Sequence, residues 1–161
     1  MNADTKQAPE LLVSGWLNTP EPITLAEQRG KVVVIEAFQM LCPGCVSHGL
    51  PQAQRIADTF SAEDVTLIGL HTVFEHHEAQ GTATALKAFL HEYRYRFPVA
   101  IDEQSEQGIP KTMAAYQLRG TPSLLLIDSK GFLRAEHFGI VDDLALGAQI
   151  MQLVDRGTDR N

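Results

Sequence analysis

The sequence predicts an α/β domain in which a mixed sheet carries helices on both faces. Segments with strand and helix character alternate along most of the 161 residues, which is typical of this class. The run 32–38 is apolar and rich in β-branched residues without polar alternation, as in a strand buried on both faces of a parallel sheet. Near the end of the chain, the turn at 129–131 leads into the segment 132–138, a hairpin signature that adds antiparallel strands.

Length and composition indicate one globular domain over residues 1–161, large enough to bury its own core. Apolar residues make up 44% and charged residues 20%, as in ordinary globular proteins. Thirteen Lys and Arg against 20 Asp and Glu give a net charge of −7. This charge argues against nucleic acid or anionic lipid as a partner. Residues 1–11 and 156–161 are expected to be frayed tails.

The first part of the chain is expected to form an extended arm or a short N-terminal hairpin, because apolar pairs flank the turn-like segment 18–22 with its two prolines. The buried strand 32–38 follows. Apolar residues then recur at helical spacing and predict a helix over 42–60. A second buried strand is predicted over 64–71.

The remaining elements follow the same alternation and end with the hairpin and a helix. They are a helix over 82–95, a strand over 97–101, a short helix over 111–117, strands over 123–127 and 132–138, and a helix over 142–154.

The chemistry is expected at Cys42-Pro43-Gly44-Cys45, which holds both cysteines of the chain and stands where the buried strand passes into the first helix. A chain with two cysteines is no disulfide-stapled scaffold, so the pair indicates redox chemistry. Helix N-terminal amides and the helix dipole stabilise a thiolate, the species that attacks a disulfide. Pro43 has no N–H to donate to the sulfur, whereas Gly44 and Cys45 have one. We expect Cys42 to be the nucleophile and Cys45 the resolving thiol; half of a zinc site is the alternative.

Two motifs together resemble a known family. Residues 31–45 read KVVVIEAFQMLCPGC and look like the active-site strand and helix of thioredoxin-fold proteins; residues 120–123 read GTPS and look like their cis-proline loop. The chain is most similar to TlpA/ResA-like thiol–disulfide oxidoreductases of the redoxin family over about residues 12–155. The resemblance implies a thioredoxin-like sheet with an N-terminal hairpin, a helical insertion before the cis-proline loop, and reversible dithiol–disulfide exchange with protein substrates.

The resemblance also implies which residues receive the substrate. Pro43 and Gly44 would lie on the cysteine side of the site, and Thr121 and Pro122 on the facing side. If the bond before Pro122 is cis, the backbone of Thr121 is free to pair with an extended substrate strand. An ordinary trans proline at the start of an edge strand is the alternative.

Glu36 matches the buried acid of thioredoxins. Desolvation is expected to raise its pKa and make it a proton acceptor for Cys45; alternatively, it reaches water or pairs with a lysine. His48, one turn after Cys45, and His71, at the end of the second strand, are candidates for tuning the thiols. A solvated helix histidine is the alternative for His48.

Two other functions remain open at this point. A peroxidase of the peroxiredoxin type shares the fold, but such enzymes carry Pro and Thr or Ser where this chain has Ile35 and Gln39. A non-enzymatic metal-binding module would use Cys42, Cys45 and the histidines of the loop 71–77. We favour disulfide exchange, with no cofactor and no bound metal.

The expected partners are protein thiols or disulfides and an electron donor or acceptor. No membrane segment or signal peptide is visible, so the expected location is the cytoplasm, or the periplasm if a leader has been removed.

Overall fold

The computed structural model describes residues 6–158 and places all seven strands in one sheet, in the order β1-β7-β6-β3-β4-β5-β2. The strands are β1 (Lys6–Gln7), β2 (Val13–Leu17), β3 (Val32–Phe38), β4 (Val65–His71), β5 (Val99–Asp102), β6 (Ser123–Ile127) and β7 (Phe132–Phe138). The helical segments are η1 (Ala26–Gln28), η2 (Cys45–Gly49), α1 (Leu50–Thr59), α2 (His77–Gln80), α3 (Ala83–Glu92), α4 (Lys111–Ala115) and α5 (Asp143–Thr158).

The predicted buried strand lies at the centre of the sheet. All seven residues of β3 are buried. β3 pairs in parallel with β4 and antiparallel with β6, and β7 continues the antiparallel side. The sheet is therefore mixed, as predicted, and the carboxyl end of β3 lies beside the start of β6, where Ala37 pairs with Ser123.

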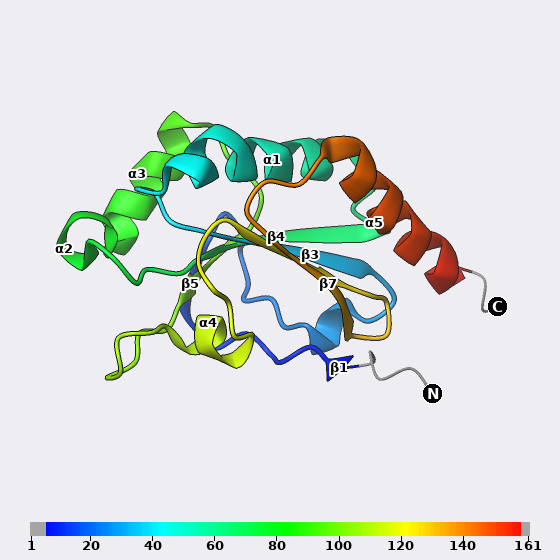
Figure 1. Cartoon of the computed structure of the whole chain (residues 1–161), viewed down its shortest axis with the longest axis horizontal. Helices are drawn as coiled ribbons and strands as arrows, with labels where there is room; N and C mark the ends of the chain where they lie inside the picture. The colour runs from blue at the N-terminus through cyan, green and yellow to red at the C-terminus, as the bar shows by residue number, and fades with distance from the viewer. Residues whose placement is uncertain (1–5, 159–161) are drawn as a thin grey trace.

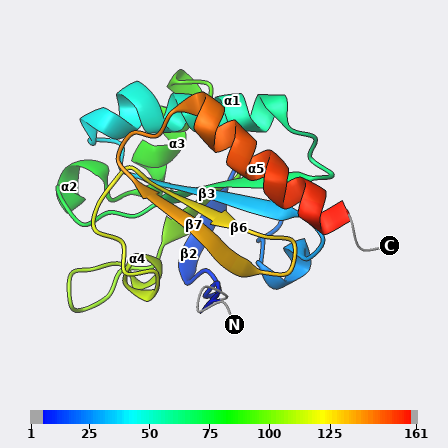
Figure 2. The ribbon, with the colours of Figure 1, turned by 45° about the vertical axis from the view of Figure 1, so that its right-hand side comes forward.

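Helices cover both faces of the sheet (Figure 1, Figure 2). α1, α3 and α5 lie on one face, and α4 lies on the other with the N-terminal segment, residues 6–17. Because β3 is covered on both sides, its successive residues divide between two cores: Val34 packs with the first group of helices, and Ile35 packs with the α4 side. This double burial explains the absence of polar alternation in the sequence.

The expected N-terminal hairpin is wrong, and the extended arm is correct. β1 pairs with β7 at one edge of the sheet, whereas β2 pairs with β5 at the other. Residues 18–25, which follow β2, form no strand, so no segment after the turn is available to pair with β2. The segment that leads into β5 stabilises the turn instead: the Asn18 amide donates to the carbonyls of Tyr95 and Phe97, at 2.9 and 3.2 Å.

Secondary structure extends into both predicted tails. Residues 6 and 7 form a strand, Ala8 and Leu11 are buried, and α5 continues to Thr158. The burial of Ala8 and Leu11 anchors the N-terminal tail, although most of its residues are polar. Residues 1–5 and 159–161 lie outside the described part of the chain.

The predicted helix over 42–60 is present with a local change in its hydrogen bonding. Its second turn, η2, is π-helical, and the N–H of Leu50 donates to the carbonyl of Cys45. The loop after β4 contains the short helix α2, which has too few residues to produce a periodic signal.

Candidate active site

Cys42 and Cys45 form a disulfide at the carboxyl end of β3, with their Cα atoms 5.2 Å apart. Cys42 is half-buried and Cys45 is fully buried, so solvent reaches the first cysteine and not the second. The N–H of Cys45 lies 3.2 Å from Cys42 Sγ and points at it. This geometry gives the sulfur of Cys42 the helix-amide donor that would stabilise a thiolate after reduction.

The loop before β6 faces the disulfide. The peptide bond between Thr121 and Pro122 is cis, and the carbonyl oxygen of Thr121 lies 3.5 Å from Cys42 Sγ. A Cβ atom added to Gly44 would lie 3.3 Å from Pro122 Cδ, so these two residues are close neighbours. Pro43, between the cysteines, is exposed. The structure therefore brings together the four residues that the resemblance implies for substrate binding.

Glu36 lies beneath this assembly and does not reach water. Its side chain is 1% exposed, and Oε1 has no hydrogen-bond partner within residues 6–158. A Cβ atom on Gly49 would overlap Oε1 and lie 3.0 Å from Pro122 Cβ, which places the carboxyl group against both residues. Burial raises the pKa of Glu36 well above its usual range. The alternative of a solvent-reaching or lysine-paired carboxylate is wrong.

The π-helical turn η2 is a feature that the sequence analysis missed. Such single π turns occur often at functional sites. Here the turn brings Gly49 against Glu36 and Pro122, where only the absence of a side chain permits the approach. A glycine inside an apolar helical pattern is the signal that could have indicated it.

The two candidate tuning histidines lie in different environments. His48 Nε2 is 3.2 Å from the carbonyl oxygen of Val141. His71 is 2% exposed, and its ring packs against Phe38 with centroids 5.2 Å apart. Burial lowers the pKa of His71 to about 4, so at neutral pH the ring is uncharged and supplies no positive charge to a thiolate.

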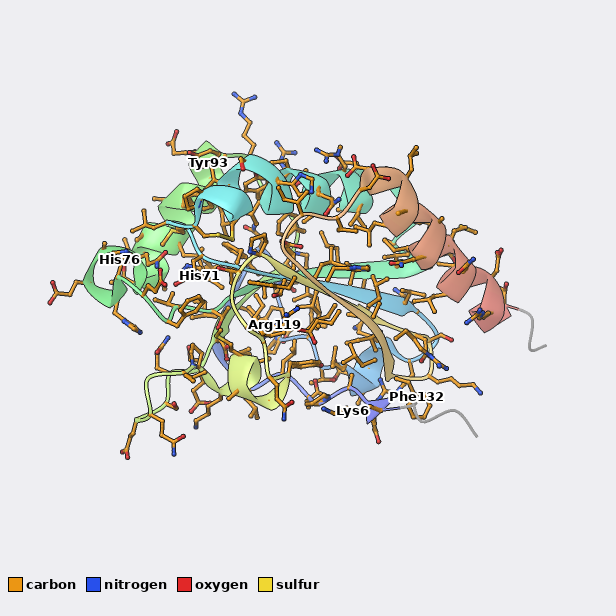
Figure 3. All side chains as sticks on the ribbon, in the orientation of Figure 1. Lys6, His71, His76, Tyr93, Arg119 and Phe132 are labelled. Atoms are coloured by element: carbon orange, nitrogen blue, oxygen red, sulfur yellow. A yellow bond between two sulfur atoms is a disulfide. The ribbon has the colours of Figure 1, made fainter. Side chains whose placement is uncertain are left out.

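The histidines of the loop 71–77 do not act as one group. His71 is buried at the end of β4, whereas His76 is exposed just before α2 (Figure 3). His77, the first residue of α2, is also exposed. Over residues 6–158, no three His, Cys, Asp or Glu side chains are arranged so that they could hold a metal ion.

Exposed apolar side chains lie beside Cys42 and beside the cis-proline loop. Leu41, next to Cys42, is 54% exposed, and Ile140 is 73% exposed. Phe138 at the end of β7 is also exposed and packs under the Arg119 guanidinium, 4.9 Å from the ring centroid. The N–H of Gly139, between Phe138 and Ile140, donates to the carbonyl of Pro122 at 2.9 Å, which holds this part of the surface to the cis-proline loop.

Residues 5–136 match the family described as AhpC/TSA. The chain belongs to the AhpC/TSA family. Within it, the fold is that of thioredoxin-like redoxins, as the resemblance implied. No helix in the described range is long and apolar enough to cross a membrane.

Two similar solved structures match nearly the whole chain. A crystal structure of a thioredoxin-like superfamily protein is 60% identical, with a TM-score of 0.90, and the match covers 92% of this chain and 96% of that one. A thiol–disulfide isomerase from Corynebacterium glutamicum is 51% identical, with a TM-score of 0.87, covering 91% and 96% of the two chains.

Curated relatives include much longer proteins. Protein DipZ of Mycobacterium tuberculosis is 30% identical over 92% of this chain, which spans only 21% of DipZ. The thiol–disulfide oxidoreductase ResA of Bacillus cereus is 27% identical over 78% of this chain and 64% of its own length. Two of these similar proteins, the isomerase and ResA, are named for an activity, and in both names that activity is exchange between thiols and disulfides.

Proposed function

We propose that this protein is a thiol–disulfide oxidoreductase that exchanges the Cys42–Cys45 pair with protein substrates. The observation that carries the proposal is the disulfide itself, at a helix start, with Cys42 half-buried and the Thr121 carbonyl 3.5 Å from its sulfur. A sulfur that the solvent reaches and that a helix amide stabilises is suited to attack. The names of the similar thiol–disulfide isomerase and ResA support the same chemistry.

In the reducing direction, the Cys42 thiolate attacks a substrate disulfide and forms a mixed disulfide, and the substrate's first sulfur leaves as a thiolate that takes a proton from water. Cys45 then loses its proton to Glu36 and attacks Cys42 Sγ. The Cys42–Cys45 disulfide forms, and the substrate's second sulfur leaves as a thiolate, which takes up a proton while Glu36 releases the one that came from Cys45. Two electrons pass from the dithiol to the substrate, and the oxidising direction is the reverse.

Glu36 suits the role of proton acceptor for Cys45. Its carboxyl group lies against Gly49, in the helical turn that begins with Cys45, and Oε1 has no partner within residues 6–158. A raised pKa brings a carboxyl group closer to the pKa of a thiol and makes proton transfer between the two easier.

The surface around the disulfide supports a protein rather than a small molecule as substrate. Leu41 exposes apolar surface next to Cys42, and Phe138 and Ile140 expose apolar surface beside the cis-proline loop. Exposed apolar patches mark protein interaction sites. The backbone of Thr121 beside Cys42 can pair with an extended substrate segment.

The test is a disulfide-reduction assay on a protein substrate with the two cysteine variants. Cys42→Ser should abolish activity, because the attacking sulfur is gone. Cys45→Ser should accumulate the mixed disulfide, detected as a covalent adduct that dithiothreitol releases. Full activity in Cys42→Ser would contradict the proposal. The equilibrium of the couple with glutathione then gives its direction: a potential near −270 mV is that of a reductant and one near −120 mV that of an oxidant.

The same purified protein separates the two alternatives. A peroxidase would consume peroxide at the expense of Cys42, yet Ile35 and Gln39 stand where peroxiredoxins have Pro and Thr or Ser. A metal-binding module would carry a stoichiometric ion that disappears in the His76→Ala/His77→Ala variant. We expect neither peroxide consumption nor such an ion.

A further inference from the structure

Two buried glutamines connect the segments that surround the disulfide. Gln39 follows β3, three residues before Cys42, and Gln80 ends α2 in the segment that follows β4. Their side chains are 3% and 1% exposed, and Gln80 Nε2 donates to Gln39 Oε1 at 3.1 Å. Neither residue takes part in the exchange chemistry proposed above.

Gln80 fixes the cysteine side of the site. Its Oε1 accepts the N–H of Leu41 at 2.9 Å, and its Nε2 also donates to the carbonyl of Glu75 at 2.7 Å. Leu41 immediately precedes Cys42 and is 54% exposed. Gln80 therefore ties the exposed residue beside the attacking sulfur to the α2 segment, residues 74–80.

Gln39 connects the same segment to the cis-proline side. Its Oε1 accepts the N–H groups of Phe74 and Glu75 at 3.2 and 3.3 Å. Its Nε2 donates to Thr121 Oγ1 at 3.4 Å. Thr121 is the residue whose carbonyl faces Cys42 Sγ, so one side chain reaches both the α2 segment and the wall opposite the cysteines.

We propose that Gln39 and Gln80 are positioning residues that fix the Leu41 and Thr121 walls of the substrate groove relative to each other through the α2 segment. The inference rests on the proposed function. Buried amides are costly unless each is hydrogen-bonded, and a fully bonded pair holds its neighbours in one arrangement. A protein substrate that contacts both walls binds more tightly because of this preorganisation. A small disulfide that contacts only Cys42 does not.

The experiment compares Gln39→Ala and Gln80→Ala with the unaltered protein on a protein disulfide and on a small aromatic disulfide. For the protein substrate, kcat/KM should fall about tenfold, through KM, which corresponds to about 1.4 kcal/mol. For the small disulfide, kcat/KM should stay within about twofold. Because both residues act through one network, the double variant should lose less than the product of the single losses.

Gln52→Ala is the matched control. Gln52 is 3% exposed, but its Nε2 donates to the Val141 carbonyl and to Asp143, both at 2.8 Å, rather than to either wall. It should reduce stability as the other variants do without changing the ratio of the two activities. Gln80→Met, which keeps the volume and removes the hydrogen bonds, should behave as Gln80→Ala and serves if the smaller residue prevents folding.

Amide hydrogen exchange provides a readout independent of activity. The Leu41 N–H should exchange faster in the Gln80 variants than in the unaltered protein and in Gln52→Ala. Unchanged Leu41 exchange, or equal losses on the two disulfides, would overturn the positioning role while Cys42-dependent activity stands. An unaltered protein inactive on both disulfides would instead overturn the proposed function and, with it, the inference.

Discussion

Two buried titratable residues, Glu36 and His71, should make stability depend on pH in opposite ways. Each is almost fully buried, and each has a polar atom without a hydrogen-bond partner in the described range. Burial favours the uncharged form in both, so it raises the pKa of the carboxyl and lowers that of the imidazole. Burial therefore makes Glu36 hold its proton to higher pH and keeps His71 unprotonated to lower pH.

Glu36→Gln should slow turnover at neutral pH about tenfold or more, because the variant keeps the shape and removes the proton acceptor. In the Cys45→Ser background, the rate of mixed-disulfide formation should be unchanged, since that step precedes the proton transfer. Stopped-flow measurement of the two steps checks this. Equal turnover with and without the substitution across neutral pH would leave Glu36 with a structural role only.

The same substitution should raise stability with a defined pH dependence. The folded protein binds the Glu36 proton more tightly than the unfolded chain does, so its stability falls as the pH rises from about 4.3, the unfolded pKa, toward the raised folded pKa. Glu36→Gln removes this loss. The stability advantage of the variant in urea unfolding should be absent below about pH 4 and grow above it.

His71→Phe should remove an acid sensitivity of the fold. The unfolded chain binds a proton at His71 below about pH 6.5, whereas the folded protein resists it down to about pH 4. Stability should therefore fall by about 2 kcal/mol from this residue alone between pH 7 and 5. In urea unfolding at both pH values, the unaltered protein should lose about 2 kcal/mol more than the variant, because the Glu36 contribution is common to both and the variant's ring can still pack on Phe38.

At the scale of elements, the π-helical turn η2 depends on one glycine. Gly49→Ala should destabilise the protein by about 1–3 kcal/mol, because the new methyl group meets Glu36 Oε1 and the Pro122 ring. It should also lower disulfide exchange, since the turn and the cis-proline loop must move apart. Thermal unfolding and the protein-disulfide assay check both effects.

Gly147→Ala is the matched glycine control. Gly147 lies in α5 with no atom within 4 Å of an added Cβ, so alanine there should stabilise by about 0.4–1 kcal/mol without changing activity. If Gly49→Ala were as harmless as Gly147→Ala, the close approach at η2 would have no energetic importance.

Elements with a strong local pattern were predictable, and those fixed by distant contacts were not. β6 and β7 occur at the predicted residues because turn chemistry and apolar runs are local signals. β1 and β2 find their partners far along the chain, in β7 and β5, so nothing nearby in the sequence indicates the pairing. The Cys42–Cys45 disulfide was predictable from the spacing of the two cysteines. The hydrogen bond between Gln39 and Gln80 was not, because it joins two polar residues that belong to no recognisable motif.

At the scale of the whole molecule, the N-terminal segment runs from one sheet edge to the other across the α4 face. Leu11 is buried there, and the Tyr116 hydroxyl donates to the carbonyl of Pro9 at 2.6 Å. Both contacts belong to the core on the side of the sheet away from α1. The segment therefore closes that core as well as pairing with the edge strands.

Leu11→Ala should cost about 2 kcal/mol, the lower end for a buried leucine, because Leu11 lies at the margin of its core. Leu12→Ala should change stability by less than about 0.5 kcal/mol, since Leu12 is 46% exposed. Urea unfolding of the two neighbours gives the comparison, and activity on a small disulfide should be unchanged in both. Equal costs would contradict the closing role of the segment.

The position of the N-terminal segment also determines where a label or a solid support can be joined to the protein without covering the disulfide. Lys6 pairs with Leu133 near the start of β7, and Gly157 lies against Ser129, whereas the disulfide faces Pro122 at the other end of β6. Figure 3 accordingly shows Lys6 beside Phe132, across the molecule from His71 and His76. A dye or a solid support joined at Lys6 or near Gly157 therefore lies away from the sulfur of Cys42, and Cys45→Ser protein immobilised there can serve as bait that retains its substrates covalently.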